Sequence, residues 1–157
     1  MRSKLIVVVS LALLSFVSCN EGEIYFKFQK INRGTWKSGE VVEFKMDSLS
    51  FNPSSKYDVG LELIYSSLYP YKDIWLTISH NLTDSLFVND TVKVNLVDGD
   101  GNRLGHGNAS LFQLSVPYKT GLHLDSASAY ILQIGNAMKD YRLVGVDKVG
   151  VLVKEVR

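Results

Sequence analysis

The sequence predicts an all-β protein, an antiparallel β-sandwich or jelly-roll-like single domain. Apolar and polar residues alternate with a period of two in about eight or nine short segments, as expected of half-buried strands. Residues typical of turns separate these segments at intervals of roughly 8–12 residues. No long stretch shows the periodicity of an amphipathic helix. We also find no internal repeat and no boundary that would divide the domain.

Four strands are predicted in the first half of the chain. In the first of them, Ile24, Phe26 and Phe28 alternate with Tyr25 and Lys27. Trp36 lies between two turns, and the polar segment 47–56 predicts a loop. In the fourth strand Trp75 is expected on the face opposite Ile74, Leu76 and Ile78. The predicted strands are 24–28, 42–46, 57–65 and 74–79.

The second half predicts four more strands. Asp98-Gly-Asp-Gly-Asn102 is the clearest turn signal, because Gly and Asn adopt the positive φ of a tight hairpin. Residues 86–88 form an apolar part of a connection that is expected to pack, and Pro117 is expected to end a strand. Residues 136–141 predict a short helical turn. The predicted strands are 91–97, 111–116, 129–134 and 146–153.

The N-terminus has the pattern of an export signal. Arg2 and Lys4 precede an apolar run at 5–17, which is too short to cross a bilayer of about 30 Å as a helix. The run ends just before Cys19, the single cysteine of the chain. It resembles a bacterial lipoprotein signal, although Phe16 stands where that pattern usually has Leu. An ordinary cleaved signal and an uncleaved membrane helix are the alternatives.

The lipoprotein interpretation divides the chain into three parts. Residues 1–18 are the signal peptide, 19–23 the lipidated cysteine with a short linker, and 24–157 the sandwich domain. Several acyl chains on Cys19 would make membrane attachment effectively permanent. The remaining chain has no second thiol, so it folds without a disulfide. Its net charge of +1 gives no case for a nucleic-acid partner.

The sequence predicts no catalytic residues, no metal site and no cofactor, and hence no enzyme. His80, His106 and His123 lie in separate predicted elements, as surface or turn histidines do, although a zinc site assembled in space is the alternative. Asp98, Asp100 and Asn102 copy only the start of a calcium-binding loop, so a tight turn is the preferred interpretation.

An aromatic cluster surrounds Pro70. Tyr69, Tyr71 and Trp75 form it together with Tyr65. Exposed aromatic side chains stack on sugar rings or anchor protein partners, because each offers a large contact area at low entropic cost. The same residues could instead close the core, which is the commoner fate of aromatic side chains. Both hypotheses are kept, with Tyr69, Tyr71 and Trp75 as the candidate binding surface.

From Tyr69-Pro-Tyr-Lys-Asp-Ile-Trp-Leu76 onward the chain resembles a known family, the gliding-motility lipoproteins of Bacteroidetes, GldH type. The ordered set also includes Asp98 to Gly105, Tyr130 to Met138 and Leu143 to Gly150, with Trp36 and Cys19 in the N-terminal half. The resemblance implies a lipid-anchored cell-envelope protein, on the outer membrane rather than the inner, associated with gliding and type IX secretion machinery. It implies no catalytic residues, and only Cys19 is transferred, as the lipid site.

The leading hypothesis is therefore a lipid-anchored, non-catalytic accessory protein that acts by binding other envelope proteins. The alternative is a surface carbohydrate-binding lipoprotein that uses Tyr69, Tyr71 and Trp75, with a glycan as its partner. A small hydrolase is a third, weaker hypothesis.

Overall fold

The computed structural model describes residues 22–46, 49–83, 86–108 and 110–156. These residues form eleven β-strands and one short 3-10 helix, and no helix among them is long and apolar enough to cross a membrane. The elements are β1 (Glu23–Lys30), η2 (Asn32–Gly34), β2 (Thr35–Lys37), β3 (Val41–Lys45), β4 (Lys56–Ser66), β5 (Asp73–His80), β6 (Val88–Asn95), β7 (His106–Gly107), β8 (Leu111–Leu122), β9 (Ile131–Asn136), β10 (Arg142–Val144) and β11 (Val146–Val156).

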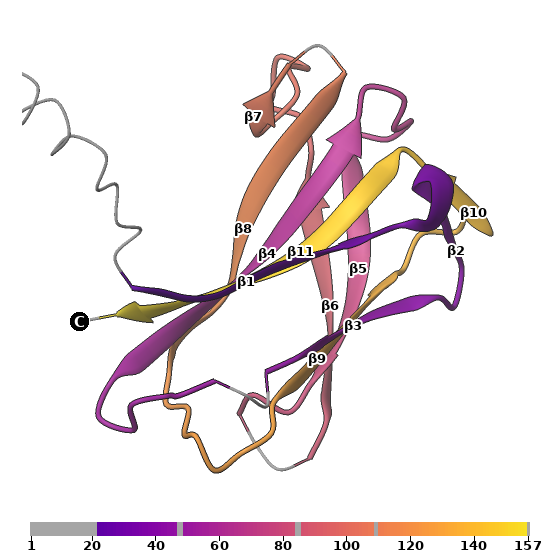
Figure 1. Cartoon of the computed structure of the whole chain (residues 1–157). Coiled ribbons are helices and arrows are strands. Elements are labelled where there is room, and N and C mark those ends of the chain that lie inside the picture. Colours follow the sequence, from indigo (N-terminus) through magenta and orange to yellow (C-terminus); the bar gives the residue numbers. More distant parts are fainter. Residues whose placement is uncertain (1–21, 47–48, 84–85, 109, 157) are drawn as a thin grey trace, which may run out of the picture.

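Two large antiparallel sheets face each other, which confirms the predicted all-β sandwich (Figure 1). The five-stranded sheet has the order β1-β11-β4-β8-β7, and the four-stranded sheet has the order β3-β9-β5-β6. Strands β2 and β10 pair separately as a two-stranded sheet. Sequence neighbours therefore often lie in different sheets, as β3 and β4 do.

The two-residue alternation of the sequence becomes the core of the sandwich. On β4, the side chains of Tyr57, Val59, Leu61, Leu63 and Tyr65 are buried between the sheets. The facing side chains come from β5 and β9 and include Ile74, Leu76, Ile78, Leu132 and Ile134, while Val149, Val151 and Val153 of β11 lie beside β4 in the same sheet. Burial of these apolar surfaces is the main driving force for folding in a domain without a disulfide.

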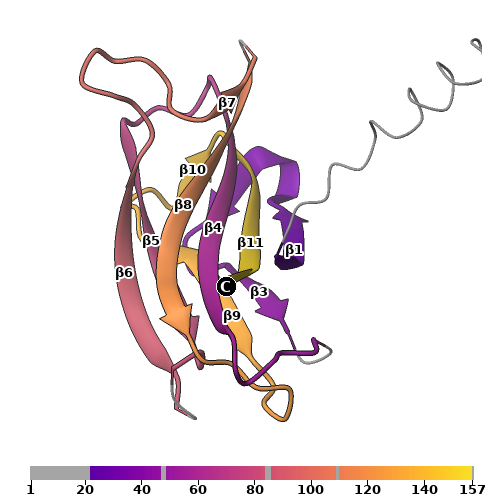
Figure 2. The same cartoon turned by 90° about the vertical axis from the view of Figure 1, so that its left-hand side faces the viewer.

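The sandwich has two distinct ends (Figure 2). The connections β3–β4, β5–β6 and β8–β9 lie at one end, and the register directs the start of β1 and the finish of β11 towards it; we call it the chain-entry end. At the opposite end, which we call the far end, the connections β4–β5 and β6–β7 meet the segment after β9. The candidate functional residues lie mainly at these two ends.

The prediction that Pro117 ends a strand is wrong, because β8 continues to Leu122. Strand β7 is two residues long and pairs only with Phe112 and Gln113, so the later part of β8 has β4 as its one neighbour. A residue without an N–H is tolerated where a strand has a free edge. As a consequence, Tyr118 and Lys119 belong to a strand and not to a loop.

The predicted helical turn at 136–141 is also wrong. Asn136 ends β9, and the next backbone N–H, that of Ala137, donates to the Trp75 carbonyl at 2.8 Å. At the other end of the segment, Ser38 N–H donates to the Tyr141 carbonyl at 2.9 Å. The backbone groups are thus bonded to neighbouring strands, so they are not available for a helical turn.

Smaller features also differ from the prediction. Trp36 lies in β2 and is fully buried, where the sequence indicated only a position between turns. The short strands β7 and β10 were not predicted. Residues Leu86, Phe87 and Val88, expected to pack, are exposed to solvent. The predicted Asp98 hairpin turn is confirmed, since the Asp98 carboxylate accepts hydrogen bonds from the Asp100 and Asn102 backbone N–H groups at 2.9 and 2.8 Å.

Candidate binding surface

The predicted aromatic cluster is divided between core and surface. Tyr65 and Tyr69 are fully buried, and their ring centroids lie 6.3 Å apart in an edge-to-face arrangement. The Tyr69 hydroxyl donates to the Asp73 carbonyl at 2.9 Å, and burial raises the pKa of Tyr69 well above its usual value. Tyr69 therefore packs as the core hypothesis predicted. Of the candidate binding residues, Tyr71 and Trp75 are the two that reach the surface.

Trp75 lies on the outer face of the four-stranded sheet, as the alternation predicted, with 41% of its surface exposed. Its partner in register on β6 is Lys93, whose Nζ lies 5.8 Å from the indole centroid. The same ammonium group forms an ion pair with Asp73 at 3.1 Å. Lys93 thus covers one side of the indole while the rest of the ring remains open.

Tyr71 precedes β5 and is 39% exposed. Its hydroxyl donates to Asp140 Oδ2 at 2.8 Å, and this hydrogen bond raises the pKa of Tyr71. The edge of the ring packs against Tyr69, with the centroids 5.9 Å apart. A tyrosine supported on both sides keeps one orientation, so this half-exposed ring is held in place.

Tyr71 and Trp75 line a surface cavity of about 490 Å³, which we call the far-end cavity. The Met138 sulfur lies 3.3 Å from the Trp75 backbone nitrogen and so brings the segment after β9 against β5. The lining combines apolar and aromatic side chains with two carboxylates and an ammonium group. The lining residues are Tyr71, Asp73, Trp75, Ala137, Met138, Lys139 and Asp140.

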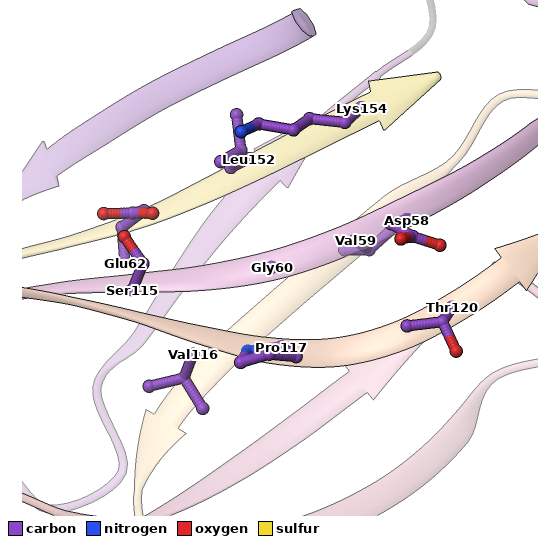
Figure 3. Close-up of a pocket in the computed structure, with 10 residues that line it drawn as sticks. All are labelled: Asp58, Val59, Gly60, Glu62, Ser115, Val116, Pro117, Thr120, Leu152 and Lys154. Carbon is purple, nitrogen blue, oxygen red and sulfur yellow. The ribbon is translucent and has the colours of Figure 1, made fainter. Parts of the chain in front are cut away.

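A second hollow, of about 240 Å³, lies on the five-stranded sheet across β4, β8 and β11 (Figure 3). Gly60 has no side chain, so the surface is open between Leu152 and Pro117, its neighbours in register. Glu62 at one side is buried, and its Oε2 accepts a hydrogen bond from Gln113 Nε2 at 3.0 Å. This hollow offers little aromatic area, and it is a weaker candidate for partner binding than the far-end cavity.

A polar cluster at the chain-entry end joins the two sheets. The sequence did not reveal this cluster. Asp90 on β6 accepts a hydrogen bond from the Tyr118 hydroxyl at 2.6 Å and forms an ion pair with Lys119 at 2.8 Å. These contacts with Lys119 and Tyr118 lower the pKa of Asp90 to about 2. Tyr118 and Lys119 come from β8 in the opposite sheet, so Asp90 links the two layers.

His80 is the fourth member of this cluster, and it is fully buried, contrary to the expectation of a surface or turn histidine. Its Nδ1 accepts the Leu82 backbone N–H at 3.2 Å, and its Nε2 lies 3.6 Å from Asp90 Oδ2. Burial lowers the pKa of His80 and favours the neutral ring. Because a substrate in solution does not reach His80, the arrangement is suited to holding the sheets together.

The structure describes only part of the predicted anchor. Cys19 and the signal peptide lie outside the described residues, and β1 begins at Glu23, one residue before the predicted start of the domain. Within the described ranges, no group of three or more His, Cys, Asp or Glu side chains is arranged to hold a metal ion.

These observations define a class of protein, a small antiparallel β-sandwich with half-exposed aromatic side chains beside a surface cavity. Residues 23–153 match the model of the GldH lipoprotein family, and the chain belongs to that family. It is also 22% identical over 119 residues to the gliding motility lipoprotein GldH of Flavobacterium johnsoniae, a match that covers 76% of this chain and 73% of that protein. Family membership places the chain among the membrane-anchored cell-envelope lipoproteins of gliding motility.

Proposed function

We propose that this lipoprotein is a non-catalytic accessory protein of the outer membrane. Lipid on Cys19 anchors it, and the far-end cavity binds another envelope protein of the gliding or secretion machinery. One observation carries the proposal: Tyr71 and Trp75 are half-exposed aromatic residues, yet neighbouring side chains already hold them in place. Preorganised aromatic anchors dominate the affinity of many protein–protein interfaces.

The position of the cavity supports the same conclusion. Cys19 precedes the start of β1 by only four residues, so a lipid there brings the chain-entry end to the membrane. The far end, which holds Tyr71 and Trp75, then projects into the periplasm or the medium and is accessible to other proteins. The cavity is lined, among the described residues, by no serine, cysteine or histidine that would serve as a nucleophile or general base.

Pull-down from detergent-solubilised native membranes tests the binding role. We expect the unaltered lipoprotein to bring down a reproducible set of envelope proteins, and the double variant Tyr71→Ala, Trp75→Ala to lose it. Phe87→Ala is the matched control, because it removes an exposed aromatic ring at the opposite end. Recovery of the same proteins with the double variant, at an unchanged unfolding midpoint, would contradict the proposal.

Membrane fractionation tests the anchor separately. Cys19→Ala removes the sulfur that would carry the lipid, so we expect the variant to move from the membrane pellet to the soluble fraction. Attachment of the variant to membranes at the unaltered level would show that another segment holds the protein there.

Glycan binding is the second candidate function, and the surface around Trp75 favours it. The outer face of the four-stranded sheet next to the indole presents hydroxyl and amide groups from Thr77, Ser79 and Thr91 on β5 and β6 and from Gln133 on β9. An aromatic ring beside such groups is the usual arrangement for stacking on a sugar ring. A glycan array probed with the unaltered protein and with Trp75→Ala distinguishes the two candidates, since only a glycan-binding protein gives a signal that depends on Trp75.

A further inference from the structure

Leu86 and Phe87, at the end of the connection that leads into β6, and Val88, the first residue of β6, form an apolar segment. Leu86 is 75% exposed, and Phe87 and Val88 are also exposed. Leu86 and Phe87 protrude from the connection and Val88 is the first residue of β6, so three consecutive exposed apolar side chains lie here, outside the ordinary pattern of a soluble surface. Exposed apolar segments of this kind commonly mark a contact with a partner or with a membrane.

The segment lies at the chain-entry end, beside β6 and at the opposite edge of the sandwich from β1 (Figures 1 and 2). The backbone leaves the sandwich there from a fixed point, because the Glu155 N–H donates to the Gly22 carbonyl at 2.7 Å. Gly22 has φ +88°, and a Cβ at this position would lie 2.7 Å from the Glu155 carbonyl oxygen, so glycine is needed for the close contact. The path by which the chain enters the fold is therefore well defined.

Cys19 lies three residues before Gly22. Three extended residues span at most about 11 Å, so the Cys19 sulfur stays close to the chain-entry end. If Cys19 carries lipid, as in the proposed function on which this inference rests, the bilayer surface lies near the same end. The short tether keeps this end of the sandwich near the lipid surface, so connections at the same end meet the membrane at a high effective concentration of lipid.

We propose that Leu86 and Phe87, with Val88 at their edge, insert into the interfacial layer of the membrane to which Cys19 is attached. The contact would be a second, weaker attachment that restricts how the sandwich tilts on its tether. Apolar side chains at the end of a tethered domain enter the boundary between headgroups and acyl chains in this way.

The charge around the chain-entry end indicates the kind of lipid surface. Basic and acidic side chains are interspersed there, and the net charge of the chain is +1. A contact of this composition depends on burial of apolar surface and not on attraction to anionic headgroups. We therefore expect insertion into neutral bilayers and little sensitivity to salt. The charged residues at this end include Lys45, Lys56, Lys154, Asp58, Asp125 and Glu155.

Fluorescence quenching on the full lipidated protein tests the proposal. Lipidation blocks the Cys19 thiol, so Leu86→Cys introduces a single reactive thiol for an environment-sensitive dye. Leu68→Cys is the matched control, because Leu68 is an equally exposed leucine, at 80%, in a connection at the far end. Both labelled proteins are reconstituted into phosphatidylcholine–phosphatidylethanolamine vesicles that carry a nitroxide quencher near the headgroups.

We expect severalfold stronger quenching of the dye at position 86 than at position 68, and the same ratio in high salt. Equal quenching at the two positions in protein that sediments with the vesicles would overturn the inference and leave the anchor intact. Protein that does not sediment with the vesicles would refute both the anchor and the membrane contact. A dye at position 86 that is already shielded without vesicles would show that a second copy covers the segment, which also overturns the inference.

Discussion

The two ends of the sandwich each contain a tyrosine that donates a hydrogen bond to an aspartate, but in opposite settings. At the chain-entry end, Tyr118 and Asp90 come from different sheets, with Lys119 and the buried His80 beside them. At the far end, Tyr71 and Asp140 meet in solvent, beside a cavity. The bond lengths are similar, at 2.6 and 2.8 Å. The difference lies in what surrounds each pair.

The two tyrosine–aspartate pairs are expected to have different roles, one in stability and the other in recognition. A partly buried polar group that loses its partner retains part of its desolvation cost, whereas an exposed group exchanges its partner for water. The Tyr118–Asp90 pair should therefore contribute to the free energy of unfolding, and the Tyr71–Asp140 pair should contribute mainly to the orientation of a binding surface.

Asp90→Ala should lower the free energy of unfolding by about 1.5–3 kcal/mol, because it leaves the Tyr118 hydroxyl, the Lys119 ammonium and His80 without their shared acceptor. Asp140→Ala removes the matching carboxylate at the far end, and we expect little change in stability. Urea unfolding of both variants measures the difference. Equal losses in the two variants would show that the cluster around Asp90 does not join the sheets.

Acid should weaken the chain-entry end first. The folded protein keeps His80 neutral, whereas in the unfolded chain the same histidine takes up a proton as the pH falls below about 6.5. The free energy of unfolding therefore decreases as the pH is lowered through that range. A second loss, of about 2 kcal/mol, follows between pH 4 and pH 2 as Asp90 is protonated, because its pKa is lowered to about 2 in the folded protein. Unfolding midpoints measured across this pH range show both steps.

Two variants identify the groups responsible for the acid effect. His80→Gln should remove the first step, and Asp90→Asn should remove the second. His106→Gln provides the control, because His106 is an exposed histidine on β7, outside the cluster around Asp90. A profile that His80→Gln does not alter would contradict the assignment to the chain-entry end.

The same comparison shows what the sequence could and could not predict. A period of two identified the long strands, and it placed Trp75 opposite Ile74, Leu76 and Ile78 correctly, because both properties are local. The sheet order is not local. His80, Asp90 and Tyr118 lie on three strands in two sheets, and nothing in the spacing of these residues indicates that they meet.

The sequence also did not predict which apolar and aromatic side chains are exposed to solvent. The sequence could not decide which aromatic residues near Pro70 reach the surface, because Tyr69 is turned inward by its hydrogen bond to the Asp73 carbonyl while Tyr71 is turned outward to Asp140. Similarly, Leu86 to Val88 have the composition of a packed segment and are nevertheless exposed. Composition predicts a preference for burial, and tertiary contacts determine the outcome.

A conservative pair of variants isolates the two hydroxyl groups. Tyr118→Phe should cost about 1–2 kcal/mol of unfolding free energy, since it removes a hydrogen bond to a charged acceptor between the sheets. Tyr71→Phe removes the same atom from an exposed pair, and its unfolding curve should overlay that of the unaltered protein. A measurable loss for Tyr71→Phe together with none for Tyr118→Phe would reverse the proposed roles of the two ends.

The smallest expected change in stability is at Trp75. The two tryptophans differ in exposure, so their fluorescence distinguishes the interior from the far end. Trp36 is fully buried, and its indole N–H donates to the Glu40 carbonyl at 2.9 Å, whereas Trp75 is open to solvent at the far end. Acrylamide should therefore quench only part of the native fluorescence, and Trp75→Phe should remove that part while changing stability by no more than about 0.5 kcal/mol.

Addition of a partner that occupies the far-end cavity should protect the Trp75 component from acrylamide, whereas insertion of Leu86 into vesicles should not. A vesicle-dependent change at Trp75 would mean that the far end, and not the chain-entry end, faces the membrane.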